Sequence, residues 1–168
     1  MKRIGYMLII AFLSLSHLSC GPVWTEETAR KEAFRDVKYN IDITQYPASD
    51  PDFQENQDAL RTGRGRVGNR FVSSNPEPPV GYVVSKLDKK GRPIITMFYR
   101  KDGSLLSIRL FSRPSYPRVA YIYSVESAYQ EMGKEFKPGE LLSVSFHISG
   151  REAFYFNPDG QCTGHVKF

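Results

Sequence analysis

The feature that most constrains the fold is a series of short alternating segments in the second half of the chain. From residue 80 onward, aromatic and β-branched residues form short runs, and turns that contain glycine separate these runs. Residues 119–125 (Val-Ala-Tyr-Ile-Tyr-Ser-Val) alternate with period two, as the two faces of a β-strand require. Asp102-Gly103 is typical of a hairpin turn. The pattern predicts a mainly β fold, an antiparallel meander of about seven or eight short strands over residues 80–168.

Two short helices are expected before this meander. Residues 25–37 favour a helix, because Thr25 can cap its start and acidic residues occupy its first turn. Residues 51–61 favour a second helix, which Asp50 can cap. The apolar face of the first helix is thin, so we expect it to dock weakly on the rest of the chain.

The rest of the N-terminal half is expected to be a linker. Residues 61–70 hold four arginines and three glycines, and residues 73–79 are rich in serine and proline. This composition indicates a flexible segment followed by a stiff, extended one. The basic segment is either a solvated loop or a contact to anionic lipid head groups. We therefore divide the chain into a signal peptide (1–19), a lipid-anchored tether with short helices and linker (20–79), and an antiparallel β domain (80–168).

The first residues of the chain form a three-part export signal. Lys2 and Arg3 precede an apolar stretch that extends to residue 18, and the small residue Ser19 follows it. This order is typical of a secretory signal peptide. The apolar stretch is shorter than the roughly 20 residues that a membrane-spanning helix requires. We therefore expect the chain to be exported and this segment to be removed.

Cys20 directly follows this segment and is the expected site of lipidation. With Ser19 before it and Gly21 after it, Cys20 resembles the cysteine of the lipobox of bacterial lipoproteins. Lipoboxes usually have leucine three residues before the cysteine, where this chain has His17. The resemblance implies cleavage before Cys20, its acylation with chains such as palmitate, and attachment to the outer membrane or cell surface. Ordinary secretion with a cut near Gly21 and an uncleaved anchor are the alternatives.

The second cysteine of the chain bears on this prediction. The sequence has two cysteines, Cys20 and Cys162. If Cys20 is acylated, Cys162 has no partner for an intrachain disulfide, and we expect it to be a small buried hydrophobic residue. The alternative is a secreted soluble protein with a Cys20–Cys162 disulfide.

A weak internal repeat runs through the second half of the chain. Residues 99–108 and 136–144 share the pattern Gly-x-Leu-Leu-Ser followed by isoleucine or valine. Gly103 and Gly139 of this pattern suit turn positions with a positive φ angle. Over residues 87–168, the pattern resembles YwqK-type, MORN-like β-hairpin repeats. The resemblance implies a sheet surface used for interaction, and it carries over no catalytic residues.

Few residues suggest catalysis or metal binding. Cys162, His147 and His165 supply three of the four ligands that a structural zinc site needs, without the usual tight spacing. A nucleophile–base pair of Cys162 and His147 lacks a motif for an orienting group or an oxyanion hole. We therefore expect no metal, no cofactor and no enzymatic activity. The alternative is an envelope hydrolase that uses His147, Cys162 or nearby acidic residues.

The aromatic content, 13% of the chain, leaves two interpretations open. Tyr121 and Tyr123 share one face of their strand, and they form either the core or a tyrosine-rich binding face. Four arginines would surround such a face: Arg109, Arg113, Arg118 and Arg151. It would suit an envelope protein, peptide or glycan. The net charge of +5 comes partly from the signal, so we expect no nucleic-acid partner. The sequence thus predicts a membrane-anchored, non-enzymatic cell-envelope lipoprotein with a β-sheet binding or scaffolding surface.

Overall fold

The computed structural model describes residues 23–75, 78–113, 115–126, 129–131 and 134–167. Cys20 and the expected signal peptide therefore lie outside the described residues. The helices are α2 (Glu26–Ala33), the short 3₁₀ helix η1 (Ile43–Gln45) and α3 (Phe53–Arg61). The strands are β1 (Arg66–Val67), β2 (Arg70–Ser74), β3 (Tyr82–Leu87), β4 (Pro93–Tyr99), β5 (Leu105–Phe111), β6 (Arg118–Ser124), β7 (Tyr129–Glu131), β8 (Lys134–Phe136), β9 (Leu141–Ser149), β10 (Glu152–Phe156) and β11 (Cys162–Lys167).

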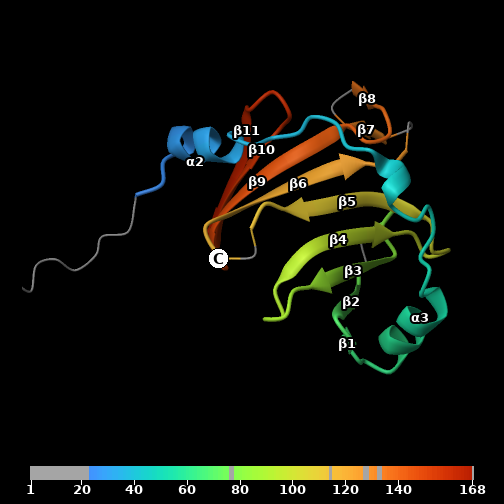
Figure 1. Cartoon of the computed structure of the whole chain (residues 1–168). Coiled ribbons are helices and arrows are strands. Elements are labelled where there is room, and N and C mark those ends of the chain that lie inside the picture. Colours follow the sequence, from blue (N-terminus) through green and yellow to red (C-terminus); the bar gives the residue numbers. More distant parts are fainter. Residues whose placement is uncertain (1–22, 76–77, 114, 127–128, 132–133, 168) are drawn as a thin grey trace, which may run out of the picture.

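Nine of these strands form one antiparallel sheet in the order β1-β2-β3-β4-β5-β6-β9-β10-β11 (Figure 1). Each strand pairs with its neighbour in sequence, except where the small β7–β8 hairpin is inserted between β6 and β9. The predicted mainly β fold, an antiparallel meander with short helices before it, is confirmed. The sheet is larger than expected, because it also contains β1 and β2.

Strands β1 and β2 come from the segment that we expected to be a flexible linker, and that prediction is wrong. Val72 of β2 lies opposite Val84 of β3 and is almost completely buried. Arg70, at the start of β2, pairs with the carboxylates of Asp52 and Glu55 near the start of α3, so its charge is compensated. Residues 23–75 are therefore part of the fold, and the predicted boundary between a tether and a β domain at residue 79 does not hold.

Helix α2 begins at the expected cap and packs more tightly than its sequence suggested. The Thr25 side chain accepts a hydrogen bond from the Thr28 backbone N–H, and the Thr28 side chain accepts one from the Thr25 N–H. Ala29 and Ala33 are fully buried against β9 and β10. Small side chains at these two positions let the helix backbone approach the sheet closely. The predicted weak docking is therefore wrong.

Helix α3 is joined to the sheet by a buried polar network around Asp50. Asp52, rather than the expected Asp50, occupies the cap position of this helix. The Asp50 carboxylate instead accepts hydrogen bonds from the Asp52 backbone N–H (3.0 Å), the Asn56 side-chain amide (2.9 Å) and the Tyr82 hydroxyl (2.7 Å). A carboxylate with several donors is tolerated in a buried position, so the network ties α3 to β3.

The chain between α2 and α3 is fastened to the ends of two strands. Backbone hydrogen bonds run from Leu141 N–H to the Tyr39 carbonyl (2.8 Å) and from Leu105 N–H to the Ala48 carbonyl (2.9 Å). Ile108 packs in the cluster below α3 and lies opposite Tyr123, which packs in the cluster below α2. Both helices therefore cover the same face of the sheet, which we call the covered face (Figure 1).

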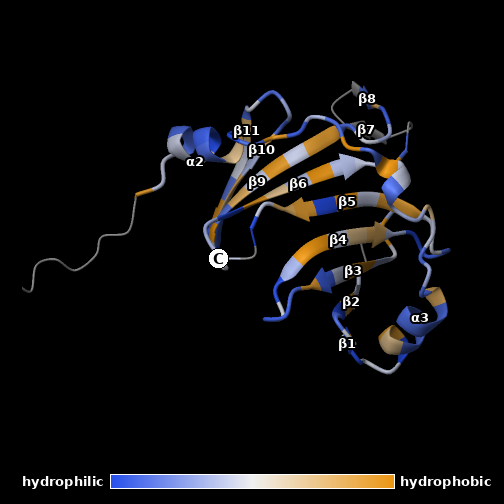
Figure 2. Cartoon of the chain, viewed as in Figure 1, coloured by the Kyte–Doolittle hydropathy of each residue, from blue (hydrophilic) through white to orange (hydrophobic). Residues whose placement is uncertain are grey.

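The covered face holds the hydrophobic core. Its buried residues form two clusters, one below α2 and one below α3: Val119, Tyr121, Tyr123, Val144, Phe146, Phe154 and Phe156 in the first, and Val72, Tyr82, Val84, Met97, Tyr99, Leu105 and Ile108 in the second. Figure 2 shows hydrophobic colour along β4, β5, β6 and β9, whereas α2 is mostly hydrophilic. The helix therefore contributes few apolar side chains, and the strands contribute most of the core.

The opposite face of the sheet, which we call the open face, carries no helix in the described part of the chain. It consists of the alternate residues of each strand. On the central strands these are Thr96 and Phe98 of β4, Ser107, Arg109 and Phe111 of β5, Arg118, Ala120 and Ile122 of β6, Ser143, Ser145 and His147 of β9, and Ala153 and Tyr155 of β10. This face mixes aromatic, hydroxyl and basic side chains.

Candidate binding face

The centre of the open face carries a cluster of basic and hydroxyl side chains. It consists of Arg109 of β5, Arg118 of β6, Ser145 and His147 of β9, and Tyr155 of β10, and we call it the cationic cluster. The strand register brings these residues together, because Arg118 lies directly opposite His147 and Ser145 lies directly opposite Tyr155. Alternation within each strand then directs all five side chains to the same face.

Aromatic rings position both arginines. The guanidinium carbon of Arg109 lies 5.0 Å from the centre of the Phe98 ring. The guanidinium carbon of Arg118 lies 4.6 Å from the centres of the Phe111 and Tyr116 rings, and one terminal nitrogen donates a hydrogen bond to the Tyr116 hydroxyl at 3.2 Å. A cation over an aromatic face is attracted by the ring and keeps its N–H edges available.

The arginines of the cationic cluster have no carboxylate partner among the described residues. The Nε atoms of Arg109 and Arg118 are buried and make no hydrogen bond within this part of the structure. Burial and the positive charge of Arg118 lower the pKa of the Arg109 guanidinium, although Tyr155 acts in the opposite direction. Two neighbouring cations without a counter-ion are costly to bury.

His147 is neutral in this environment. Burial, followed by the positive charges of Arg118 and Arg109, lowers the pKa of His147 to about 4. Its Nε2 atom lies 2.9 Å from the Ser145 hydroxyl, and the Tyr155 ring packs at its edge with centroids 6.3 Å apart. The cationic cluster therefore carries two positive charges at neutral pH, both on arginines.

The structure brings together some of the predicted binding residues and separates others. Arg109 and Arg118 share the open face, whereas Tyr121 and Tyr123 lie on the covered face, where they are 7% and 2% exposed. Two more arginines were predicted at this face, and neither joins the cluster: Arg113 pairs with Glu32 of α2 (3.3 Å), and Arg151 is exposed in the turn between β9 and β10. The two tyrosines therefore belong to the core, and the basic side chains face the other way.

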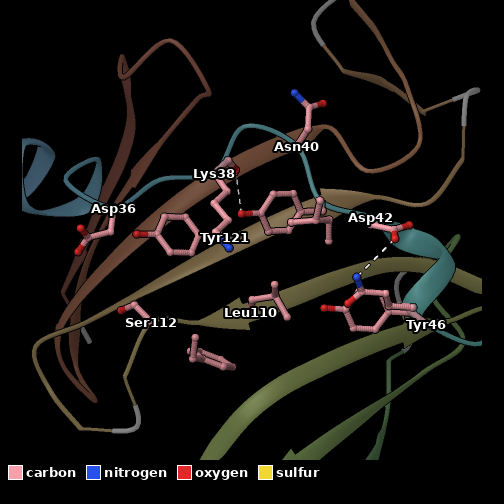
Figure 3. A pocket seen from close by; sticks show the side chains of 12 residues that line it. Asp36, Lys38, Asn40, Asp42, Tyr46, Leu110, Ser112 and Tyr121 are labelled. Atoms are coloured by element: carbon pink, nitrogen blue, oxygen red, sulfur yellow. Dashed lines mark hydrogen bonds between the residues drawn. The ribbon is translucent and has the colours of Figure 1, made fainter.

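A pocket of about 500 Å³ lies on the covered face, in the gap between α2 and η1 (Figure 3). In Figure 3, Tyr121 and Tyr46 lie at its two ends with Leu110 between them. Two of its three phenol groups are already engaged, since the Tyr121 hydroxyl donates to the Ala33 carbonyl (3.2 Å) and the Tyr123 hydroxyl donates to the Lys38 carbonyl (2.9 Å). These bonds hold the N-terminal segment on the sheet, so the pocket lies between two segments that pack together in the fold.

The residues considered for catalysis or metal binding do not converge. His147 is on the open face, whereas Cys162 packs against the α2 cluster on the covered face. His165 is also on the covered face. Its ring stacks on the Phe154 ring with centroids 3.9 Å apart, and its Nε2 atom lies 2.9 Å from a carboxylate oxygen of Glu152. The His147–Cys162 nucleophile–base pair is therefore not formed. No group of three or more potential metal ligands occurs within the described ranges.

Cys162 is partly buried, with its thiol 3.5 Å from the Gly164 carbonyl oxygen. Its possible disulfide partner, Cys20, lies outside the described residues. Among the helices that the structure describes, none combines the length and apolar character needed to cross a membrane. No protein-family model, curated protein or solved structure matches the chain. The functional argument therefore rests on the residues themselves.

Sequence reasoning had singled out Arg109 and Arg118, but it did not place Ser145, His147 and Tyr155 on the same face. Alternation does place Arg118 and Tyr121 on opposite faces of their strand, and this signal was present in the sequence. The sequence contains no signal for which of the two faces the helices would cover. His147 joins the cluster because β6 pairs with β9, a contact that bypasses the β7–β8 hairpin.

Proposed function

We propose that this chain is an exported cell-envelope lipoprotein, anchored through an acylated Cys20, that binds a partner on its open face and is not an enzyme. The observation that carries the binding role is the cationic cluster, in which Arg109 and Arg118 lie together without a carboxylate partner among the described residues. Uncompensated arginines stacked on aromatic rings are typical of recognition sites, because arginine and aromatic side chains are enriched at interfaces.

The anchoring role rests on the N-terminal sequence. Lys2 and Arg3, the apolar stretch up to residue 18, and the Ser19-Cys20-Gly21 sequence together support export, cleavage and acylation. Several acyl chains on one residue give stable attachment, because each buried methylene contributes about 0.8 kcal/mol. Helix α2 begins at Glu26, close to Cys20 in sequence. The anchor would thus hold the sheet near the outer membrane or cell surface without a long tether.

Replacing the proposed lipidation site tests this function. Cys20→Ala should leave a longer, uncleaved precursor that takes up no labelled palmitate, because both processing and acylation require the thiol. The measurement is metabolic labelling of the envelope fraction with intact-mass analysis. Cys162→Ala is the matched control, since it removes the other cysteine and should be processed and labelled normally. Normal cleavage of Cys20→Ala, or loss of label in Cys162→Ala, would contradict the proposal.

A further inference from the structure

We infer that the cationic cluster binds a doubly charged oxyanion, namely the phosphate group of a soluble phosphomonoester. This inference rests on the proposed function, because it names the ligand class of the same open face. It concerns Arg109, Arg118 and the hydroxyl group of Tyr155.

The two positive charges of the cationic cluster favour a ligand with two negative charges. Arginine stays protonated in proteins, so Arg109 and Arg118 contribute two positive charges. His147 contributes none at neutral pH, since its pKa is lowered to about 4. No carboxylate within the described residues pairs with either arginine. A phosphate monoester carries close to two negative charges at pH 7 and therefore neutralises the cluster, whereas a single carboxylate leaves one cation unmatched.

The geometry of the cluster suits the oxygen atoms of phosphate. Stacking of Arg109 on Phe98 and of Arg118 on Phe111 holds both planar guanidinium groups on the open face, where the charge of Arg118 acts on Arg109. Their forked N–H groups match phosphate oxygens, and charge-assisted hydrogen bonds of this kind are stronger than neutral ones. Tyr155 adds a hydroxyl that makes no hydrogen bond within the described residues. The site thus offers several donors and lacks acidic side chains that would repel an anion.

The partial burial of the arginines favours a soluble ligand over a membrane surface. Both side chains lie along the sheet, and their Nε atoms are inaccessible to solvent. Binding to the head groups of a flat bilayer relies on basic side chains that project from the protein. A small phosphorylated molecule can instead approach guanidinium groups that lie close to the sheet.

Titration calorimetry with inorganic phosphate tests the site. The full chain is purified in non-ionic detergent and titrated at constant ionic strength, with acetate as the singly charged comparison. Phosphate should bind saturably and more tightly than acetate. Arg109→Gln and Arg118→Gln should each weaken phosphate binding by about 10-fold or more, because each loses a charge-assisted pair. Arg61→Gln, which removes one charge from an exposed position on α3, should bind like the wild type. Equal affinities in all variants, equal binding of acetate, or absence of binding would overturn the inference.

A second variant separates a ligand-binding arginine from a structural one. Arg109→Met keeps the length of the side chain and removes its uncompensated charge. We expect its melting temperature in phosphate-free buffer to be unchanged or higher than that of the wild type, since a buried unpaired cation destabilises the fold. We also expect added phosphate to raise the melting temperature of the wild type and not of Arg109→Met. A lower melting temperature of the variant without phosphate would show that Arg109 is structural and would overturn the inference.

Two further measurements identify the source of the phosphate and separate this inference from the proposed function. Glycerol 3-phosphate should compete with inorganic phosphate, whereas binding confined to vesicles that contain phosphatidic acid would overturn the soluble source. A photo-cross-linking residue at Ser107 of the open face should capture an envelope component, and one at Asp58, on exposed α3, should not. Capture at Ser107 without phosphate binding would overturn the phosphate ligand alone, whereas failure of both would also count against the binding role of the open face.

Discussion

The covered and open faces are built from the same strands, yet the tyrosines of one and the arginines of the other differ in their partners. On the covered face, the hydroxyls of Tyr82, Tyr121 and Tyr123 each donate a hydrogen bond to Asp50 or to a backbone carbonyl of the N-terminal segment. Burial raises the pKa of all three phenols, so they remain neutral donors. On the open face, Arg109 and Arg118 keep buried Nε atoms without partners in the described structure.

Under the proposed function, the covered face serves stability and the open face serves recognition. A side chain whose polar atoms are all paired contributes to the folded state, whereas an unpaired buried cation reduces stability until a ligand arrives. Because successive residues of a strand point to opposite faces, one strand can carry both roles. In β6, Tyr121 joins the core and Arg118, three residues earlier in sequence, belongs to the cationic cluster.

Removing one aromatic ring from each face should have the largest effect and tests whether the two faces contribute differently to stability. Phe146 of β9 is fully buried and contacts Trp24, with ring centroids 4.5 Å apart. We expect Phe146→Ala to lower the free energy of unfolding by about 3–5 kcal/mol, because it leaves a cavity in the core. Phe71→Ala, on the open side of β2 with 47% of Phe71 exposed, should cost less than about 1 kcal/mol. Chemical denaturation measures both, and similar losses would mean that the open face also serves as core.

The tight contact of the N-terminal segment with the sheet predicts the next largest effect. Gly139 has a φ angle of +86°, and a Cβ atom there would lie 2.3 Å from the Ile41 carbonyl oxygen. Gly68 also has a positive φ angle, +58°, with open space around it. A left-handed conformation costs a non-glycine residue about 1–2 kcal/mol, so Gly68→Ala should lose about that amount of unfolding free energy. Gly139→Ala should lose more, because the segment must also move.

Denaturation of the two glycine variants therefore isolates the contribution of this contact, since both share the backbone penalty. Equal losses of unfolding free energy would show that the segment around Ile41 can move without destabilising the fold. The covered face would then not depend on the close approach of this segment to Gly139. Hydrogen exchange at the Ile41 N–H, which donates to the Gly139 carbonyl at 2.9 Å, would report the same loosening locally.

Much of the fold could be predicted from the sequence because its signals are local. Period-two alternation in residues 119–125 and the Thr25 cap each depend on a few neighbouring residues, and both are confirmed. Strand β2 was missed because Arg70 and Gly68 look like linker residues in the sequence. The carboxylates of Asp52 and Glu55 that compensate Arg70 approach it only after α3 has folded onto β2.

The cationic cluster was only partly predictable for the same reason. The sequence shows that Arg118 and Tyr121 point to opposite faces, but it does not show which face the helices cover. The position of α2 depends on Ala29 and Ala33, whose small side chains gave a weak signal although they allow the closest packing. The pairing of Arg118 with His147 depends on which strand lies beside β6, and this is a property of the whole sheet.

The smallest expected effect is a pH dependence that belongs to the open face. His147 is surrounded by Arg109, Arg118, Ser145 and Tyr155, and its pKa falls from 6.5 to about 4. Below pH 6.5 the unfolded chain binds a proton at His147 and the folded chain does not, so stability falls as the pH decreases toward 4. His147→Gln should remove about 1 kcal/mol of this loss between neutral pH and roughly pH 5.5.

The titration of the His147 ring, followed by NMR, is the direct measurement. The ring should stay neutral down to about pH 4, and Arg118→Met should shift its titration upward, because one of the two neighbouring cations is removed. A ring that titrates near 6.5 in the wild type would mean that the arginines are screened by solvent or already paired with an anion. Exhaustive dialysis against anion-poor buffer distinguishes these two cases. Removal of a bound anion would lower the pKa of His147 and added phosphate would raise it again, whereas solvent screening would leave the pKa near 6.5 in both conditions.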